Sequence, residues 1–298
     1  MERLVSLNLE ECENLRNLPR SISNLKSLET LHLSGCLKID ELPEEIGNMT
    51  ALVELLADKT SIKQLPFSFG RLKNLKTVSL SGCKGPSSKS WLSRFSSWIL
   101  PKSSNAITLL PASFSGLCYL ESLNLSDCNL CEGGIRIDLG SLSSLQELDL
   151  SENNFPNLPH GIGRLPKLRS LNLNQCTSLQ SIPELPKSLE MLSADECTSM
   201  ERLSISSNMK SLENFYLGNC HRLVEIQGLE SLQSSPTFFM EGCNNLANDS
   251  RKNLLQVLSL SLSLSLLLLE EWSNNLIHTF LSVYTLEIYS NFSSLITL

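Results

Sequence analysis

The chain has 298 residues, of which 41% are hydrophobic and 18% are charged, and its formal net charge is −7 at pH 7. This length and apolar content are sufficient for a sizeable core, and the negative balance disfavours a nucleic-acid backbone as the main partner. We expect no signal peptide, because residues 1–12 already follow the pattern of the rest of the chain.

A leucine pattern recurs along most of the sequence. One clear copy starts at Leu28 and continues through Leu31, Leu33 and Cys36 to Leu42-Pro43, in the form L-x-x-L-x-L-x-x-C-x-x-L-x-x-L-P. A fixed period of about 20–29 residues with this lettering is typical of a leucine-rich repeat solenoid. Ten units are visible, and the last is a degenerate one near residue 235. The other nine units start at Leu4, Leu28, Leu52, Leu75, Leu120, Leu145, Leu168, Leu189 and Leu212.

Each unit predicts one short strand and one return segment. The L-x-L core, such as Leu31-His32-Leu33, alternates apolar and polar residues, which is the period of a strand with one buried face. The following Leu-Pro stretch cannot continue as a ladder strand, because proline lacks an N–H. We therefore expect an α/β-type solenoid, with parallel strands on the concave face and irregular, 3-10 or short helical returns on the convex face.

Two segments depart from the repeat. The long step from Leu75 to Leu120 contains an insertion at about 84–109, and the repeat fails after Leu246. We expect a repeat domain over 1–246 and a low-complexity, hydrophobic, poorly ordered tail over 247–298. A transmembrane helix over 254–269 is the alternative, but that run is shorter than the roughly 20 residues that a span needs.

Eight of the ten cysteines share one place in the repeat, three residues after the L-x-L pair. Thr60 and Asn153 fill this slot in the other two units. Cysteine, threonine and asparagine are all small and polar, and can bond to the turning backbone inside a coil, so we predict a structural role. Free buried thiols would indicate a reducing compartment. Cys118, outside the slot, is predicted to lie in the core. The slot cysteines are Cys12, Cys36, Cys83, Cys128, Cys176, Cys197, Cys220 and Cys243.

The solvent-facing positions beside the L-x-L pairs are the candidate binding residues. They are polar to acidic, whereas the basic side chains fall in the return segments, so we expect an acidic concave face and a basic flank. Aromatic side chains on the late strands would act as contact anchors for a protein partner. The candidate concave face comprises Glu10, His32, Glu54, Asp58, Asn124, Glu147, Asp149, Asn172, Asp195, Tyr216 and Phe239.

The sequence shows no catalytic, cofactor or metal constellation. The four histidines are scattered over different units, and Cys128 and Cys131 form a C-x-x-C pair without a second pair to complete a zinc site. The stretch 82–90 lacks the glycine that a phosphate loop places before its lysine. We therefore expect no catalytic, cofactor or metal residue, no cofactor and no small-molecule substrate.

The residue pattern of the repeats resembles that of a known family. Leu25-Lys-Ser-Leu28-Glu-Thr-Leu31-His-Leu33-Ser-Gly-Cys36, followed by Leu42-Pro43-Glu-Glu-Ile46, is similar to the repeats of plant TIR-type nucleotide-binding leucine-rich-repeat disease-resistance proteins. The segments 80–98, 110–130 and 179–200 resemble the same family, so the likeness covers about residues 1–246.

The resemblance implies a function in plant defence. In such receptors a TIR domain cleaves NAD, a nucleotide-binding domain acts as the switch, and the repeats keep the receptor inactive and recognise pathogen effectors. We accordingly expect a fragment of a longer receptor, without enzyme activity of its own. Its expected partner is a protein, either an effector or the receptor's own nucleotide-binding domain, with no nucleic acid and no membrane. The expected location is the cytoplasm, with the nucleus as a further location.

Two other classes remain open. A secreted or cell-surface leucine-rich-repeat receptor or inhibitor ectodomain would need disulfide-bonded caps and a leader sequence. A repeat-targeted ubiquitin ligase of the bacterial type would need a catalytic cysteine in a separate domain, and residues 247–298 contain no cysteine.

Overall fold

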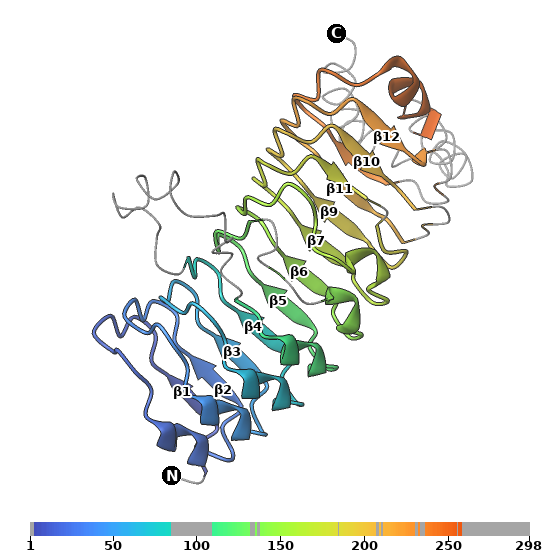
Figure 1. Cartoon of the computed structure of the whole chain (residues 1–298). Helices are drawn as coiled ribbons and strands as arrows, with labels where there is room; N and C mark the ends of the chain where they lie inside the picture. The colour runs from blue at the N-terminus through green and yellow to red at the C-terminus, as the bar shows by residue number, and fades with distance from the viewer. Residues whose placement is uncertain are drawn as a thin grey trace, which may run out of the picture.

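The computed structural model describes residues 3–84, 109–131, 135, 138–183, 185–206, 209, 211–229, 232, 236–254 and 256–257. Its main feature is a parallel sheet of ten strands, one per repeat unit, in the order β1-β2-β3-β4-β5-β6-β7-β9-β11-β13. The strands stack side by side along the long axis of the molecule, from β1 in blue through β6 in green toward β11 (Figure 1). The strands are Ser6–Asn8 (β1), Thr30–His32 (β2), Glu54–Leu56 (β3), Thr77–Ser79 (β4), Ser122–Asn124 (β5), Glu147–Asp149 (β6), Ser170–Asn172 (β7), Met191–Ser193 (β9), Asn214–Tyr216 (β11) and Thr237–Phe239 (β13).

The strand register confirms the repeat pattern. The central residue of each strand pairs with the central residue of the next, as in Leu7 with Leu31 and Leu148 with Leu171. These central side chains point into the core, and the residues on either side of them lie on the concave face, where all but Ser79 are at least partly exposed. Because every strand is in the same register, the concave face consists of columns of equivalent side chains from consecutive coils.

The return segments of the early and middle units are 3-10 helices, as expected. The first four each follow a proline, whose φ between −71° and −63° leads into the helical turn. In the fifth, the Asp138 side chain accepts a hydrogen bond from the Gly140 N–H at 3.0 Å. These helices are Arg20–Asn24 (η1), Glu44–Asn48 (η2), Phe67–Arg71 (η3), Ala112–Gly116 (η4), Leu139–Ser141 (η5) and Ile162–Arg164 (η6).

The late units differ from the prediction of irregular or helical returns. Their return side carries a second, three-stranded parallel sheet of Ser181–Ile182 (β8), Arg202–Ser204 (β10) and Glu225–Gln227 (β12). Strand β8 ends directly before Pro183, whereas β10 and β12 belong to units that have no proline at this place. Proline therefore ends a return-side strand, as at Pro183, but it does not prevent the residues before it from pairing in the ladder.

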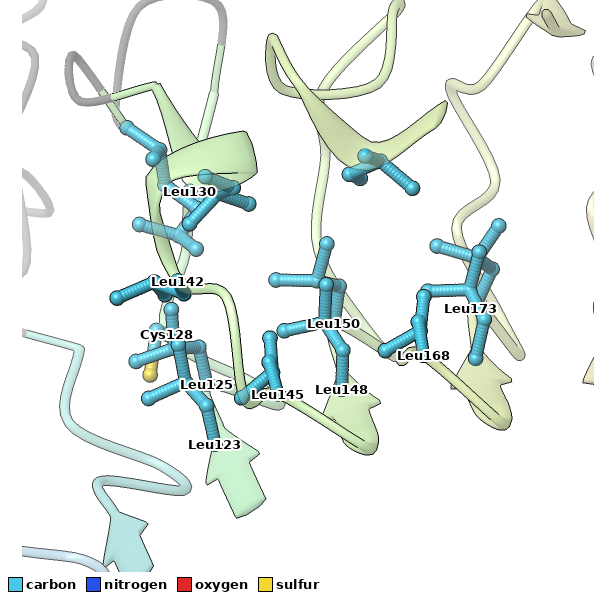
Figure 2. Close-up of a cluster of buried hydrophobic side chains, with 14 of the residues drawn as sticks. Leu123, Leu125, Cys128, Leu130, Leu142, Leu145, Leu148, Leu150, Leu168 and Leu173 are labelled. Atoms are coloured by element: carbon cyan, nitrogen blue, oxygen red, sulfur yellow. The ribbon is translucent and has the colours of Figure 1, made fainter. Parts of the chain in front are cut away.

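Rows of leucine from successive coils fill the space between the two sides. Leu125, Leu150 and Leu173 occupy the same position in three neighbouring coils, and their side chains point into the interior (Figure 2). All three are completely buried. Burying one such side chain stabilises the fold by roughly 1.5–3 kcal/mol, so that adjacent coils depend on each other for stability.

The folded core continues past residue 246, where the sequence pattern places the end of the repeats. Residues 248–254 are helical, and Leu254 and Val257 are buried against the last coils. The Ser250 hydroxyl oxygen accepts a hydrogen bond from the Ile226 N–H at 3.2 Å, which ties this helix to strand β12. The predicted poorly ordered tail from 258 onward and the insertion at 85–108 lie outside the described residues.

The turn after each strand of the main sheet is left-handed at one repeated position. The residue before the cysteine slot has φ between +51° and +79° in all ten units, and only three of these residues are glycine. A left-handed conformation costs a non-glycine residue roughly 1–2 kcal/mol. The coil geometry is therefore maintained against a local backbone preference by the bonds of the neighbouring slot.

Glycine is required where consecutive 3-10 helices touch. A Cβ atom on Gly70 in η3 would lie 2.0 Å from the carbonyl oxygen of Ser113 in η4, and one on Gly47 in η2 would lie 2.3 Å from the carbonyl oxygen of Ser68. Both obstacles are backbone atoms, so a side chain can be accommodated only if two coils separate.

We predict that Gly70→Ala lowers the stability by about 1–3 kcal/mol, because the added methyl group forces η3 away from η4. Chemical denaturation followed by circular dichroism measures the shift of the midpoint. The control is Asn48→Ala, an exposed position of η2, which should stay within about 0.5 kcal/mol of wild type. Equal effects of the two substitutions would contradict close helix stacking.

Candidate functional site

The cysteine slot forms hydrogen bonds between consecutive coils. The Cys36 thiol donates to the Leu9 carbonyl at 3.1 Å, Cys128 to Leu80 at 3.0 Å, and Cys243 to Leu217 at 2.9 Å. In each case the acceptor is the last residue of the L-x-L pair, or its equivalent, in the preceding unit. Cys83, Cys176, Cys197 and Cys220 make the same bond at 3.1–3.3 Å.

The two other slot residues also donate to backbone carbonyls, Asn153 to its own and the preceding coil and Thr60 within its own coil. The Asn153 amide donates to the carbonyls of Leu125 and Leu150 at 2.8 and 2.9 Å, and the Thr60 hydroxyl donates to Ala57 at 2.9 Å. The structural interpretation of the slot is therefore confirmed for the units after the first. In the first unit Cys12 is exposed.

Burial suppresses ionisation of the slot thiols. Desolvation raises the pKa of Cys128, Cys176 and Cys197 from 9.0 to about 12 in each case. All ten cysteines are free, but only Cys12, Cys118 and Cys131 are exposed. The prediction that Cys118 lies in the core was wrong. It lies two residues after the end of η4, and its thiol faces solvent while the nearby Leu117 and Leu120 fill the interior.

The eleven candidate residues all lie on the concave face or on the turn directly after its strands, and none is buried. They occupy three columns: the first strand residue, as in Glu54; the third strand residue, as in Tyr216; and the residue two places beyond the strand, as in Asp58. The structure thus brings them together as one continuous surface rather than as a compact cleft.

Several candidates also have structural partners. The side chains of Asn124, Asp149 and Asn172 each accept a hydrogen bond from the backbone N–H two residues further on, at 2.9–3.1 Å. Asp58 accepts from the Ser81 N–H at 2.8 Å, and Asp195 accepts from the Gly218 N–H at 2.6 Å. These bonds stabilise the turn after the strand and link it to the next coil, a role that sequence reasoning missed.

The charge separation expected between the concave face and its flank is incomplete. Lys76 and Arg169 were assigned to the return segments, but each lies one residue before a strand of the main sheet. Lys76 pairs with Glu121 at 2.9 Å, and Arg169 pairs with Glu190 at 3.0 Å, in both cases across neighbouring coils. On the face itself, His32 lies 3.3 Å from Glu54.

An aromatic pair and a groove mark the C-terminal half of the concave face. The rings of Tyr216 and Phe239 stack with a centroid distance of 4.7 Å and an interplanar angle of 5°. The groove, of about 320 Å³, lies at the start of β6, β7, β9 and β11 and includes Met191, Glu190 and Glu213. Sequence reasoning missed these three groove residues. The column before each strand could have identified two of them, because Glu190 and Glu213 occupy the same repeat position as Arg169.

Among the described residues, no group of three or more His, Cys, Asp or Glu side chains is arranged to hold a metal ion. Within the same part of the chain, no helix is both long and apolar enough to cross a membrane.

The stacked coils, the parallel concave sheet and the repeated slot define a leucine-rich repeat solenoid. Residues 1–223 match the family described as "Disease resistance protein RPS4B-like, leucine-rich repeats". The chain therefore belongs to this family of plant disease-resistance repeats.

Individual relatives agree with this assignment. TMV resistance protein N of Nicotiana glutinosa is 52% identical over 85 residues, which are 28% of this chain and 7% of that protein. Disease resistance-like protein DSC1 of Arabidopsis thaliana is 36% identical over 228 residues, which are 74% of this chain and 17% of that protein. The chain thus spans less than a fifth of the length of these two relatives.

A solved structure shows the same fold. The leucine-rich repeat domain of the type III effector XopL has a TM-score of 0.60 and 20% identity, with 80% of this chain and 76% of that chain covered. At this identity the likeness supports the solenoid architecture alone.

The buried thiols should make stability depend on pH. A thiol whose pKa is raised on folding stabilises the folded state below the unfolded value of 9.0, and this contribution is lost as pH rises toward 12. We predict that stability falls above pH 9 by up to about 1.4 kcal/mol per pH unit for each such thiol. Denaturation of wild type and of the triple variant Cys128→Ser/Cys176→Ser/Cys197→Ser at pH 7, 9 and 10.5 measures this. Parallel pH profiles for the two proteins would contradict it.

The concave carboxylates should separate into two classes. We predict that Asp195→Ala lowers stability by about 1–3 kcal/mol, because the Gly218 N–H loses its acceptor. Glu147→Ala, at an exposed strand position, should change it by less than about 0.5 kcal/mol. Thermal denaturation of the two single variants provides the comparison, and a larger loss for Glu147→Ala would refute the division.

Proposed function

We propose that this chain is the sensor and autoinhibitory repeat region of an intracellular plant immune receptor, acting as a non-catalytic protein-binding module. Its partner would be a pathogen effector or the receptor's own nucleotide-binding domain. The proposal places it in the cytoplasm, with the nucleus as a further location. Membership of the disease-resistance family supports the defence role.

The observation that carries the proposal is the exposed concave sheet. Coil stacking is achieved by the leucine rows and the cysteine slot, neither of which uses the first and third strand columns. Glu147 is exposed, and Tyr216 and Phe239 form an aromatic pair on the same solvent-facing side. Aromatic side chains presented in this way are the residues that most often dominate the energy of protein–protein contacts.

The state of the cysteines supports an intracellular location. All ten are free, whereas a secreted ectodomain is expected to carry disulfide-bonded caps. Seven of the ten are buried in the slot, where their bonds to backbone carbonyls require them to remain reduced.

Affinity purification from plant extract tests the proposal. We predict that proteins retained by wild type are lost from the variant Glu147→Lys/Tyr216→Ala. They should be kept by the matched variant Glu41→Lys/Phe67→Ala, which makes the same kind of change on exposed residues of the return segments. Quantitative mass spectrometry of the retained proteins is the measurement, after circular dichroism has shown that both variants are folded.

Two results would contradict the proposal. One is a set of retained proteins that survives the concave substitutions and is lost only with the return-side pair. The other is a wild-type protein that retains nothing beyond what both variants retain.

A further inference from the structure

The groove at the start of β6, β7, β9 and β11 is lined by acidic side chains and by one large apolar side chain. Its volume is about 320 Å³, and Glu147, Glu190 and Glu213 line it together with Met191. Met191 is 36% exposed, which is unusual for a large apolar side chain on a strand of the sheet. The methylene stem of a long side chain could pack on Met191 while its head group reaches the carboxylates.

The charge in the groove is not balanced internally. Arg169 is the only basic residue among those that line it, and its guanidinium is paired with Glu190 at 3.0 Å. Glu147 and Glu213 are exposed and form no ion pair within the described residues. A cationic side chain from a partner would supply the missing charge, whereas an acidic one would be repelled.

Next to the groove, Tyr216 has one free ring face. In the sheet register Tyr216 lies between Phe239 and Ser193. Phe239 stacks on one face of the ring at 4.7 Å, so the opposite face is directed toward β9, where the neighbour is only a serine. Ser193 is on the same strand as the groove residue Met191, two residues further on, so both side chains lie on the same side of the sheet and this ring face lies beside the groove.

We propose that the groove and the free face of Tyr216 together bind a basic, arginine-bearing segment of the partner protein. A guanidinium stacks on an aromatic ring and pairs with carboxylates at the same time, which suits this combination better than an ammonium group. This inference rests on the proposed function and specifies the chemistry of its partner.

Selection from an unbiased dodecapeptide display library, with the folded chain as bait, provides the probes. We expect the selected peptides to contain arginine and lysine at about twice their share in the library or more. Fluorescence polarisation on the tightest peptide then measures its Kd. Replacing its arginines by glutamine should weaken binding about 10-fold or more, and replacing them by lysine should weaken it less.

Matched variants of the chain separate the groove from general acidity. Glu147→Gln/Glu213→Gln should weaken binding of that peptide about 10-fold, and the effect should shrink at high salt. Glu41→Gln/Glu201→Gln removes the same charge from exposed positions outside the groove and should leave Kd within about 2-fold. All four positions are exposed, so the folded state should be kept in both variants.

The failures are distinguishable. Peptides without a basic excess that still need Tyr216, as shown by Tyr216→Ala, would overturn the basic-segment inference and leave the proposed concave surface standing. Binders that are indifferent both to Tyr216→Ala and to Glu147→Gln/Glu213→Gln would overturn the inference and also count against the proposed function. A library without any enriched binder would overturn the inference as well.

Discussion

The fold depends on one repeated contact: in eight of the ten units a small polar side chain inside the coil donates a hydrogen bond to the backbone of the coil before it. The Cys36, Cys128 and Cys243 thiols all donate to the last carbonyl of the preceding strand motif at 2.9–3.1 Å. The carbonyls of Leu9 and Leu80 also accept a hydrogen bond from the backbone N–H of their own slot residue, so the thiol supplies a second bond, which comes from the next coil. It also maintains the spacing at which the leucine rows of adjacent coils pack together. The left-handed residue before the slot is also tied to the next coil by its own backbone, as where the Glu11 N–H donates to the Ser34 carbonyl at 2.8 Å.

This arrangement divides the residues of each unit into structural and available positions. Leucines and the slot residue are buried, and glycines such as Gly70 allow the 3-10 helices to approach. Even on the solvent side, Asp58 and Asp195 have a structural role, because each carboxylate accepts a hydrogen bond from a backbone N–H of the next coil. Among the candidate residues, Glu147 and the Tyr216–Phe239 pair make no bond that the coils need, so they are the positions where a binding specificity can change without loss of the fold.

The sequence was sufficient to predict the structural features that recur in every unit. It predicted the ten parallel strands of the main sheet, irregular or short helical returns after proline, and the structural role of the slot. The sequence did not predict features that depend on contacts between particular units, because the repeat pattern carries no information about them. Two strands of the second sheet, β10 and β12, lie in units without proline at this place, and the third, β8, ends at Pro183. The exposure of Cys118 depends on the direction of its side chain after the η4 turn. The groove beside Met191 depends on the lengths of side chains from four different coils, which no single repeat reveals. The hydrogen bonds of backbone N–H groups between coils likewise depend on the three-dimensional arrangement, as where the Asp195 carboxylate accepts from the Gly218 N–H.

We infer that a protein partner binds to the concave sheet and not to the return side. Carboxyl-labelling mass spectrometry, applied to the chain with and without a protein that it retains, distinguishes the two surfaces. We expect labelling of Glu147 and Glu213 to fall on binding, while labelling of Glu41 and Glu201 stays unchanged. Protection of Glu41 and Glu45 on the return side, with Glu147 and Glu213 labelled as in the free chain, would contradict it.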